Sequence, residues 1–477
     1  MYLGLDLGTS ALKALVADIN GNIIKEASAS YLVKYVLNNG TEQDPKDWLL
    51  ALDKVLKDLK PYLSEVRALA ISGQMHGLVM LDKNDEVIRP CILWNDGRTV
   101  KENNYLNERK EEIYRNTSNI SYAGFTLPKL LWVYQNERAN FNKIAKVMLP
   151  KDYLVYYLTG NFVSDYTDMA GTLLLDVKNR CYSEAQIKLT RLSLKNLPKL
   201  HESYDVVGYV KEDLALKYGF TKTKVMAGGA DNALAALATN TISPGSSNIS
   251  LGTSGTILMP IKEIKPLNSY GLHIFSHIKD SYIMGCILSA ASSRKWFLEE
   301  ILETKDYNKN EEEMSSANTN NLYFLPYLQG ERSPHNDPLA KGAFVGLTST
   351  TTRGAMSKAI LEGVSFALRD SLEIVKKAGY EINTLSLCGG GAKSKLWCQI
   401  ISNVMKMDVK TLENEQGPAY GAILLAMIGD KKIALEDISH YVKFASTYHP
   451  ENTSYYDAKY QKFTRLYPAL KSVFKDN

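Results

Sequence analysis

The opening of the chain alternates between short apolar runs and tight turns. Residues 2–6 and 12–17 are apolar or alternate with a period of two, and Asn20-Gly21 is a hairpin-turn dipeptide ahead of a third run at 22–27. This pattern predicts an antiparallel meander of three strands.

The first turn of this meander has the sequence Asp6-Leu7-Gly8-Thr9-Ser10, with Lys13 close behind it. Such a turn offers backbone amides, two hydroxyls and a cation, which together favour a phosphate-binding loop. Gly-Thr-Ser turns also occur without any ligand, so this turn alone leaves both interpretations open.

Helical and strand patterns alternate after the meander. Residues 45–60 carry apolar side chains at helical spacing, which predicts a helix that covers the sheet. Strands are predicted at 68–71, 78–81 and 87–94, and a helix-rich region at 100–200.

Polar residues lie at the ends of these strands, among them Gln74, His76, Asp96 and Arg98. Ligands gather at strand ends in sheets that helices cover, which favours a binding site here. The alternative is that His76 is an ordinary loop residue.

The second half of the chain begins as the first half does. Residues 247–260 give a strand, the turn Leu251-Gly252-Thr253-Ser254 and a second strand, and Leu7 to Ser10 carry the same four residues half a chain earlier. Two turns of one design, each opening one half, predict a duplicated domain that binds a polyphosphate from both sides.

Three more segments complete the expected second half. Residues 303–321 are polar and predict a surface loop, whereas 352–378 predict a long amphipathic helix. A strand at 385–388 leads into Gly389-Gly390-Gly391-Ala392-Lys393-Ser394, where three glycines let a ligand approach the backbone. Residues 417–428 predict an apolar helix whose small residues pack closely.

A lone acid, Asp231, stands between a predicted strand at 224–227 and a predicted helix at 232–238. One interpretation is that it caps the helix, as Asp often does. The other is a general base that accepts a proton from a substrate hydroxyl during phosphoryl transfer. A helix N-terminus stabilises the carboxylate, so we expect Asp231 to be a weak base.

Composition narrows the class of protein. With 477 residues, of which 45% are hydrophobic and 23% charged, the chain fits a globular protein of two or three domains. The 56 Lys and Arg residues and 52 Asp and Glu residues are interspersed, which argues against a nucleic-acid ligand.

Cysteines and apolar runs indicate the compartment. The five cysteines are odd in number and form no C-x-x-C pair, and no apolar run reaches the length of about 18 residues that a membrane span needs. The N-terminus has no basic lead, and the histidines form no metal-like cluster. We therefore expect a cytoplasmic protein without a membrane partner.

Nine stretches together resemble the FGGY family of carbohydrate kinases over nearly the whole chain. They are GLDLGTSALKA (4–14), GQMHG (73–77), ILWNDGR (92–98), GFTLPKLLWV (124–133), LPKDYL (149–154), AGGADNA (227–233), SLGTSGT (250–256), LPYLQGERSPHNDP (325–338) and CGGGAKS (388–394). No single stretch is decisive, but their joint order and spacing are specific.

The resemblance implies an α/β protein with two actin-like ATPase domains of the ribonuclease H-like fold, flanking a central cleft. Residues 1–243 would form the N-terminal FGGY domain, with the sugar site, the first phosphate loop and the catalytic Asp. Residues 244–477 would form the C-terminal FGGY domain, with the second phosphate loop and the adenosine site.

The resemblance also implies roles for single residues. Asp231 matches the catalytic base and Asp6 the acid near the phosphates, and both would hold Mg²⁺, directly or through water. The sugar site would contain Met75, His76, Asp231 and Asn232. ATP would contact Thr9, Ser10, Lys13, Gly252, Thr253, Ser254, Gly389, Gly390, Gly391 and Ser394.

The implied reaction is transfer of the γ-phosphoryl group of ATP to the terminal hydroxyl of D-xylulose. GQMHG is the main reason for choosing xylulose, because glycerol kinases carry a charged pair there. The alternatives are another sugar or polyol, such as ribulose, gluconate or another pentulose, and, more remotely, an actin-like nucleotide switch without a sugar. Homodimers are common in the family, so a homodimer is one expected assembly.

Overall fold

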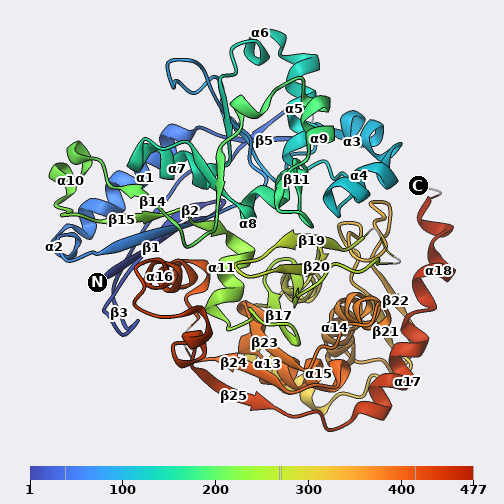
Figure 1. Cartoon of the computed structure of the whole chain (residues 1–477). Helices are drawn as coiled ribbons and strands as arrows, with labels where there is room; N and C mark the ends of the chain where they lie inside the picture. Colours follow the sequence, from blue (N-terminus) through green and yellow to red (C-terminus); the bar gives the residue numbers. More distant parts are fainter. Residues whose placement is uncertain (38, 268, 270, 414, 476–477) are drawn as a thin grey trace. The chain divides into compact units, whose positions relative to one another are not determined.

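The computed structural model describes residues 1–37, 39–267, 269, 271–413 and 415–475. The chain divides into two compact units (Figure 1). The first contains Met1–Ile242, Ile274–Ser281 and Gln416–Val442, and the second contains Ser243–His273, Tyr282–Glu415 and Lys443–Asn477.

The first unit is organised by a mixed sheet of seven strands. Strands β1, β2 and β3 form the antiparallel meander expected from the sequence, and β6 pairs with β1 in parallel. The order β14-β15-β6-β1-β2-β3 has β16 as an additional partner of β6. The strands are β1 (Tyr2–Leu7), β2 (Ala11–Ala17), β3 (Ile23–Ser30), β6 (Ala68–Gly73), β14 (Val206–Tyr209), β15 (Lys224–Met226) and β16 (Gly229–Ala230).

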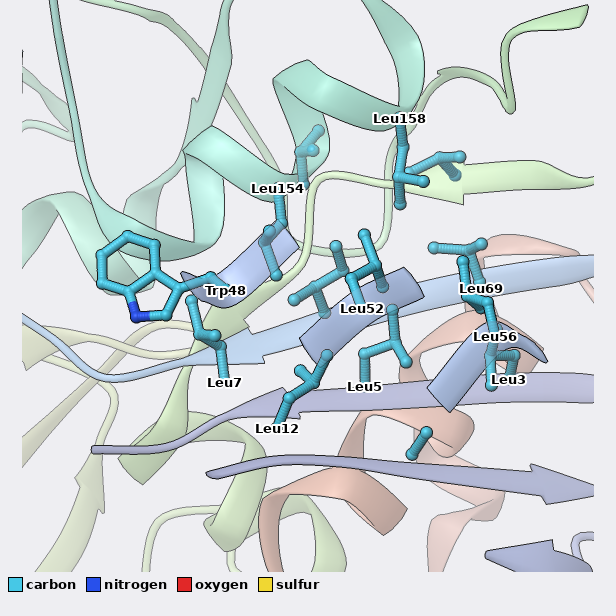
Figure 2. Close-up of a cluster of buried hydrophobic side chains, with 14 of the residues drawn as sticks. Leu3, Leu5, Leu7, Leu12, Trp48, Leu52, Leu56, Leu69, Leu154 and Leu158 are labelled. Atoms are coloured by element: carbon cyan, nitrogen blue, oxygen red, sulfur yellow. The ribbon is translucent and has the colours of Figure 1, made fainter. Parts of the chain in front are cut away.

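Helices α1 (Pro45–Asp58) and α7 (Pro150–Thr159) close the core over one face of this sheet, as Figure 2 shows. Helix α1 begins at Pro45 because Asp44 caps it by accepting the amide of Lys46, and it buries the side chains at helical spacing. Leucines of β1 interdigitate with those of the two helices. The cluster includes Leu3, Leu5, Leu7, Leu12, Trp48, Leu52, Leu56, Leu69, Leu154 and Leu158.

Helix α16 (Gly417–Gly429) is distant in sequence but packs on β1, β6 and α11 (Asp231–Ala238) of the same unit (Figure 1). Glycines permit the close approach. A Cβ atom at Gly4 would lie 2.1 Å from the carbonyl oxygen of Ala419, and one at Gly421 would lie 1.9 Å from that of Leu234. The predicted close packing of this helix is confirmed.

The remaining elements of the first unit are smaller. The other strands are β4 (Lys34–Val36), β5 (Gly40–Gln43), β7 (Val79–Leu81), β8 (Cys91–Ile92), β9 (Lys146–Met148), β10 (Val163–Asp165), β11 (Leu175–Asp176), β12 (Cys181–Tyr182) and β13 (Lys199–His201). The other α-helices are α2 (Lys60–Leu63), α3 (Val100–Asn107), α4 (Lys110–Thr117), α5 (Thr126–Asn136), α6 (Arg138–Phe141), α8 (Tyr166–Met169), α9 (Glu184–Thr190) and α10 (Glu212–Tyr218).

The second unit repeats the sheet order of the first. Its order β20-β18-β17-β23-β24-β25 corresponds strand by strand to β3-β2-β1-β6-β15-β14, with β17 antiparallel to β18 and parallel to β23. The duplicated strand-turn-strand pattern is therefore confirmed. The strands are β17 (Ser246–Leu251), β18 (Gly255–Ile261), β20 (Ser281–Ile287), β23 (Thr384–Cys388), β24 (Val409–Leu412) and β25 (Phe444–Tyr448).

Helices α14 (Arg353–Lys377) and α15 (Lys395–Met405) belong to the second unit, and α14 fulfils the prediction for 352–378. The other helices are α12 (Ala291–Trp296), α13 (Tyr307–Ser316), α17 (Thr453–Phe463) and α18 (Leu466–Leu470), and the other strands are β21 (Tyr323–Leu325) and β22 (Ala343–Val345). All residues of β19 (His273–Ser276) except His273 are grouped with the first unit.

Two sequence predictions were wrong. The strand expected at 87–94 is reduced to the two residues Cys91–Ile92, because Pro90 before them has no amide hydrogen for a ladder. The loop expected at 303–321 contains α13, which Asp306 caps by accepting the amide of Lys309. Only Asn310 and Met314 are buried along that helix, so its sequence lacks an apolar stripe.

Within the described ranges, no helix combines the length and the apolar character that crossing a bilayer requires.

Candidate active site

Asp231 follows a strand and a tight turn and lies at the start of a helix. Strand β15 is followed by Gly228, whose φ is +79° and whose Cβ atom would lie 2.3 Å from the carbonyl oxygen of Ile71. Strand β16 then pairs with β6, and Asp231 is the first residue of α11. Oδ1 of Asp231 accepts the amide of Asn232 at 2.7 Å, so the residue does contribute a cap-like bond.

The pKa of Asp231 is raised into the range that suits a general base. Burial and the charge of Asp6 raise its pKa from 3.8 to about 7, against the opposing effect of the Asn232 amide. The expectation that the helix N-terminus makes Asp231 a weak base is therefore wrong. Desolvation and a second carboxylate outweigh the helix dipole.

Asp6 lies on β1, opposite Lys13 of β2 and Ser72 of β6 in the strand register. Burial raises its pKa, and the Ser72 hydroxyl and the charge of Lys13 act against that rise. Among the described residues Oδ1 of Asp6 has no hydrogen-bond partner. A buried carboxylate oxygen without a donor beside a second carboxylate is a suitable ligand for a divalent cation.

The described residues contain no group of three or more His, Cys, Asp or Glu side chains arranged to hold a metal ion. Asp6 and Asp231 alone would leave most positions around a Mg²⁺ ion to water and phosphate oxygens, which is how Mg²⁺ is held in many kinases. The residues present therefore fit a magnesium ion that arrives with its nucleotide.

The turn Gly8-Thr9-Ser10, which the sequence predicts to bind phosphate, is braced by the residues around it. The carbonyl of Thr9 accepts Nε2 of Gln43 at 2.5 Å, and its hydroxyl accepts Nε1 of Trp94 at 3.0 Å. Ser10 is exposed. Lys13 is engaged, because its Nζ donates to Oε1 of Gln416 at 2.7 Å.

Met75 and His76 lie next to the start of α11. The side-chain amide of Asn232 is 3.5 Å from the sulfur of Met75, so the base and the GQMHG segment share one neighbourhood. His76 has a φ of +68°, in the left-handed region that a branched or bulky residue rarely adopts. A residue keeps this backbone conformation where its surroundings determine it.

Side chains from the stretch GFTLPKLLWV (124–133), to which the sequence assigned no individual roles, hold His76 in place. Its carbonyl accepts Oγ1 of Thr126 at 3.0 Å and Nζ of the fully buried Lys129 at 2.8 Å. Its ring stacks on Phe125 with a centroid distance of 4.6 Å, and Nδ1 lies 2.6 Å from the carbonyl oxygen of Gly171. Burial lowers the pKa of Lys129 to about 7.

Gly171 makes room for both residues of the expected sugar site. A Cβ atom there would lie 2.6 Å from Nδ1 of His76 and 2.8 Å from Cε of Met75. No sequence signal distinguishes this glycine from the others.

Asp96 and Arg98 are engaged in contacts within the fold. Asp96 accepts the amide of Thr41 at 2.6 Å and Nε of Arg98 at 2.9 Å. Arg98 also pairs with Glu42 at 2.7 Å and lies over the ring of Trp132. Gln74 donates to Gln43, so it supports the brace of the phosphate turn.

The second unit contains a cavity of about 860 Å³ beside its duplicated turn. Thr253, Gly390, Gly391 and Ser394 line it, and the volume lies in the range of small-molecule sites. Gly252 and Ser254 belong to the same turn as Thr253, which ends where β18 begins.

The glycine loop adopts a conformation that its glycines permit. Gly389 has a φ of +90°, and its amide donates to Oε1 of Glu415 at 2.6 Å. A Cβ atom at Gly391 would lie 2.7 Å from Cβ of Leu251, whereas one at Gly390 would meet nothing within 4 Å. Ser394 caps α15 by accepting the amide of Trp397.

Helices α12 and α13 supply a wall of this cavity that the sequence did not predict. Arg294 and Tyr307 line it, with the guanidinium 5.3 Å from the ring centroid. Glu311 fixes this wall to the glycine loop, because it pairs with Arg294 at 2.8 Å and accepts the Ser394 hydroxyl at 2.5 Å. The helix cap at Asp306 was the available signal for α13.

A duplicated sheet with a hydroxyl-rich turn in each copy, an acid pair in one and a cavity of about 860 Å³ in the other fit the ATP-dependent sugar kinase that the family resemblance implies. The family models agree. Residues 1–238 match the N-terminal domain of the FGGY family of carbohydrate kinases, and residues 247–429 match its C-terminal domain. The chain belongs to this family.

Individual relatives cover the whole chain. A xylulose kinase of Lactococcus lactis is 37% identical, and the match covers 99% of this chain and 97% of the relative. A solved structure described as a xyloylose kinase from Brucella ovis has a TM-score of 0.95, 37% identity and 99% coverage of each chain. A gluconate kinase from Lactobacillus acidophilus has a TM-score of 0.96 at 26% identity, covering 100% of this chain and 99% of its own.

Proposed function

We propose that the chain transfers the γ-phosphoryl group of ATP to the terminal hydroxyl of D-xylulose, giving D-xylulose 5-phosphate. The observation that carries this proposal is the contact between Asn232 and Met75, which brings the base and the GQMHG segment together. The xylulose kinase names of relatives that match nearly the whole chain support the same substrate.

Asp231 acts as the general base. Its carboxylate accepts the proton of the sugar hydroxyl as the oxygen bonds to the γ-phosphorus and the bond from that phosphorus to the ADP oxygen breaks. Met75, His76 and Asn232 hold the sugar. Asp6, with Asp231, holds the magnesium ion, which neutralises phosphate charge when it is bound.

The remaining predicted residues bind ATP. Thr9, Ser10 and Lys13 in the first unit and the turn Gly252-Thr253-Ser254 in the second contact phosphates. Gly389-Gly390-Gly391 and Ser394 contact the adenosine, and the cavity that three of these residues line has the volume such a ligand needs.

We divide these functions at residue 243. Residues 1–243 carry the sugar site and the base, and residues 244–477 carry the adenosine site, although Gln416–Val442 packs with the first compact unit. A homodimer and a cytoplasmic location remain predictions. Light scattering tests the first and cell fractionation the second.

A coupled assay of ADP release tests the proposal, with MgATP and D-xylulose, D-ribulose, L-ribulose, L-xylulose, gluconate or glycerol. We expect D-xylulose to give the highest kcat/KM and Asp231→Asn to remove about 10²-fold to 10⁴-fold of kcat. A different preferred sugar would contradict the roles of Met75 and His76 but leave the base intact. The gluconate kinase neighbour makes gluconate the most informative competitor.

The nucleotide-switch alternative predicts a different result. ATP turnover would then be slow and would not increase with any of the six acceptors. Sugar-dependent turnover excludes that alternative.

A further inference from the structure

A network of buried charges lies beneath the segment that delivers Asp231. Lys151 on α7 is fully buried, and its Nζ lies 2.6 Å from Oδ1 of Asp152 and 3.2 Å from Oδ1 of Asp165. Oδ2 of Asp165 accepts the hydroxyls of Thr167 at 2.5 Å and Ser203 at 2.7 Å. Lys151 and Asp152 lie within LPKDYL (149–154), one of the nine stretches of the family resemblance, which assigned them no role; Asp165, Thr167 and Ser203 lie outside all nine.

This network binds both ends of the turn before Asp231. Nζ of Lys151 donates to the carbonyl of Ala227 at 3.0 Å, and Oγ1 of Thr167 accepts the amide of Ala230 at 2.9 Å. The turn between Ala227 and Ala230 packs tightly against Lys151, because a Cβ atom at Gly228 would lie 3.0 Å from Cδ of that lysine.

We propose that Lys151, Asp165 and Thr167 are positioning residues for Asp231, and this inference rests on the proposed role of that residue as the base. The three side chains fix Ala227 and Ala230, and the residue after Ala230 is the base itself. A shift of about 1 Å in a reacting group is enough to lower a rate about 10²-fold.

The buried charges also have a structural explanation that must be separated from positioning. Removing one partner of a buried ion pair is strongly destabilising, so loss of activity in Lys151→Met alone would be ambiguous. Thr167→Val is the milder change. It keeps the shape and the ion pair between Lys151 and Asp165 but removes both hydrogen bonds of the Thr167 hydroxyl, which accepts the Ala230 amide and donates to Asp165.

A matched control exists in the same unit. Thr190 is buried like Thr167. Its Oγ1 accepts the amide of Leu192 at 3.1 Å and donates to the carbonyl of Ile187 at 2.7 Å. Thr190→Val therefore also removes one accepted amide and one donated hydroxyl bond, although the hydroxyl of Thr190 donates to a backbone carbonyl and that of Thr167 to the carboxylate of Asp165. Thr167→Ser is the conservative variant, because it retains the hydroxyl.

The experiment compares kcat, both KM values and Tm for Thr167→Val, Thr167→Ser, Thr190→Val and Asp231→Asn in the full chain. We expect Thr167→Val to lower kcat by about 10-fold to 100-fold, with the KM for MgATP within about twofold of wild type. Thr167→Ser should recover most of the rate. Thr190→Val should lower Tm by a similar amount but retain kcat.

Two outcomes would overturn the inference. In the first, Thr167→Val keeps the kcat of Thr190→Val while Asp231→Asn is inactive, so that the base stands and the positioning role fails. In the second, Thr167→Ser is as slow as Thr167→Val, so that the hydroxyl is not what matters. An active Asp231→Asn would instead refute the proposed base.

Discussion

The rate of the enzyme at low pH tests Asp231 as the base most directly. Its pKa is raised from 3.8 to about 7, and only the ionised carboxylate can accept the sugar proton. With a midpoint near 7, about half of the molecules are competent at pH 7, about a tenth at pH 6 and about a hundredth at pH 5. We therefore expect kcat/KM to fall about tenfold per pH unit below 7.

The assay follows ADP release from about pH 5 to about pH 9 with sugar and MgATP both well below their KM values, a regime that reports the free enzyme. Asp6→Asn is measured in the same buffers. Removing the charge of Asp6 takes away one cause of the raised pKa of Asp231, so the normalised acid limb should move to lower pH. Titration of the nucleotide is common to both proteins and cancels in this comparison.

A wild-type rate that stays flat from about pH 5 to about pH 8 would refute the raised pKa of the base. An acid limb that does not move in Asp6→Asn would refute the coupling of the two carboxylates. Since the two groups interact, the midpoint belongs to the pair, and the shift between the proteins is the decisive quantity.

The remaining predictions concern stability and the two binding regions. Because the folded pKa of Asp231 lies above its unfolded value, the ionised carboxylate destabilises the fold. Asp231→Asn should therefore raise the free energy of unfolding at pH 8 by at most about 4 kcal/mol. This gain should fade as the pH falls through 7 towards 4, which urea titrations at several pH values would show. Gly171→Ala should displace His76 and Met75 and raise the sugar KM about tenfold or more without changing the KM for MgATP, measured by steady-state kinetics. Gly390→Ala should raise the KM for MgATP with little change in Tm, because the added methyl enters open space. Gly391→Ala should instead lower Tm by several degrees in a thermal melt, because its added methyl meets the side chain of Leu251.

Local patterns explain why much of the fold could be predicted. Apolar residues at a period of two and one Asn-Gly turn predict the meander of β1, β2 and β3, and apolar residues at helical spacing predict α1. The repeat of Leu-Gly-Thr-Ser located β17 and β18 without any knowledge of the sheet. Each of these signals lies within a few residues of the element that it predicts.

The support of the site could not be predicted, because it depends on contacts between distant parts of the chain. Lys129 donates to the carbonyl of His76 and Gly171 leaves space for its ring, and both residues lie on other elements. The sequence does not show whether a lysine is buried or exposed. The direction of the pKa shift of Asp231 failed for a similar reason. The local rule for helix starts is sound, but Asp6 approaches from β1, which is distant in sequence.

The two copies of the strand-turn-strand unit differ in charge, which is consistent with the proposal that the first copy contributes to the base. In the first copy Asp6 is opposite Lys13 across β1 and β2. Aligning Leu7 with Leu251 places Ser250 where the first copy has Asp6, and Ser250 is opposite Thr256, so the second copy has hydroxyls in place of the acid and the cation. A neutral turn can contact phosphate without adding a carboxylate that would repel it, whereas the acid of the first copy raises the pKa of Asp231. The duplicated fold thus supplies two similar turns, and in our proposal the charged residues of the first copy are the ones that adjust the base.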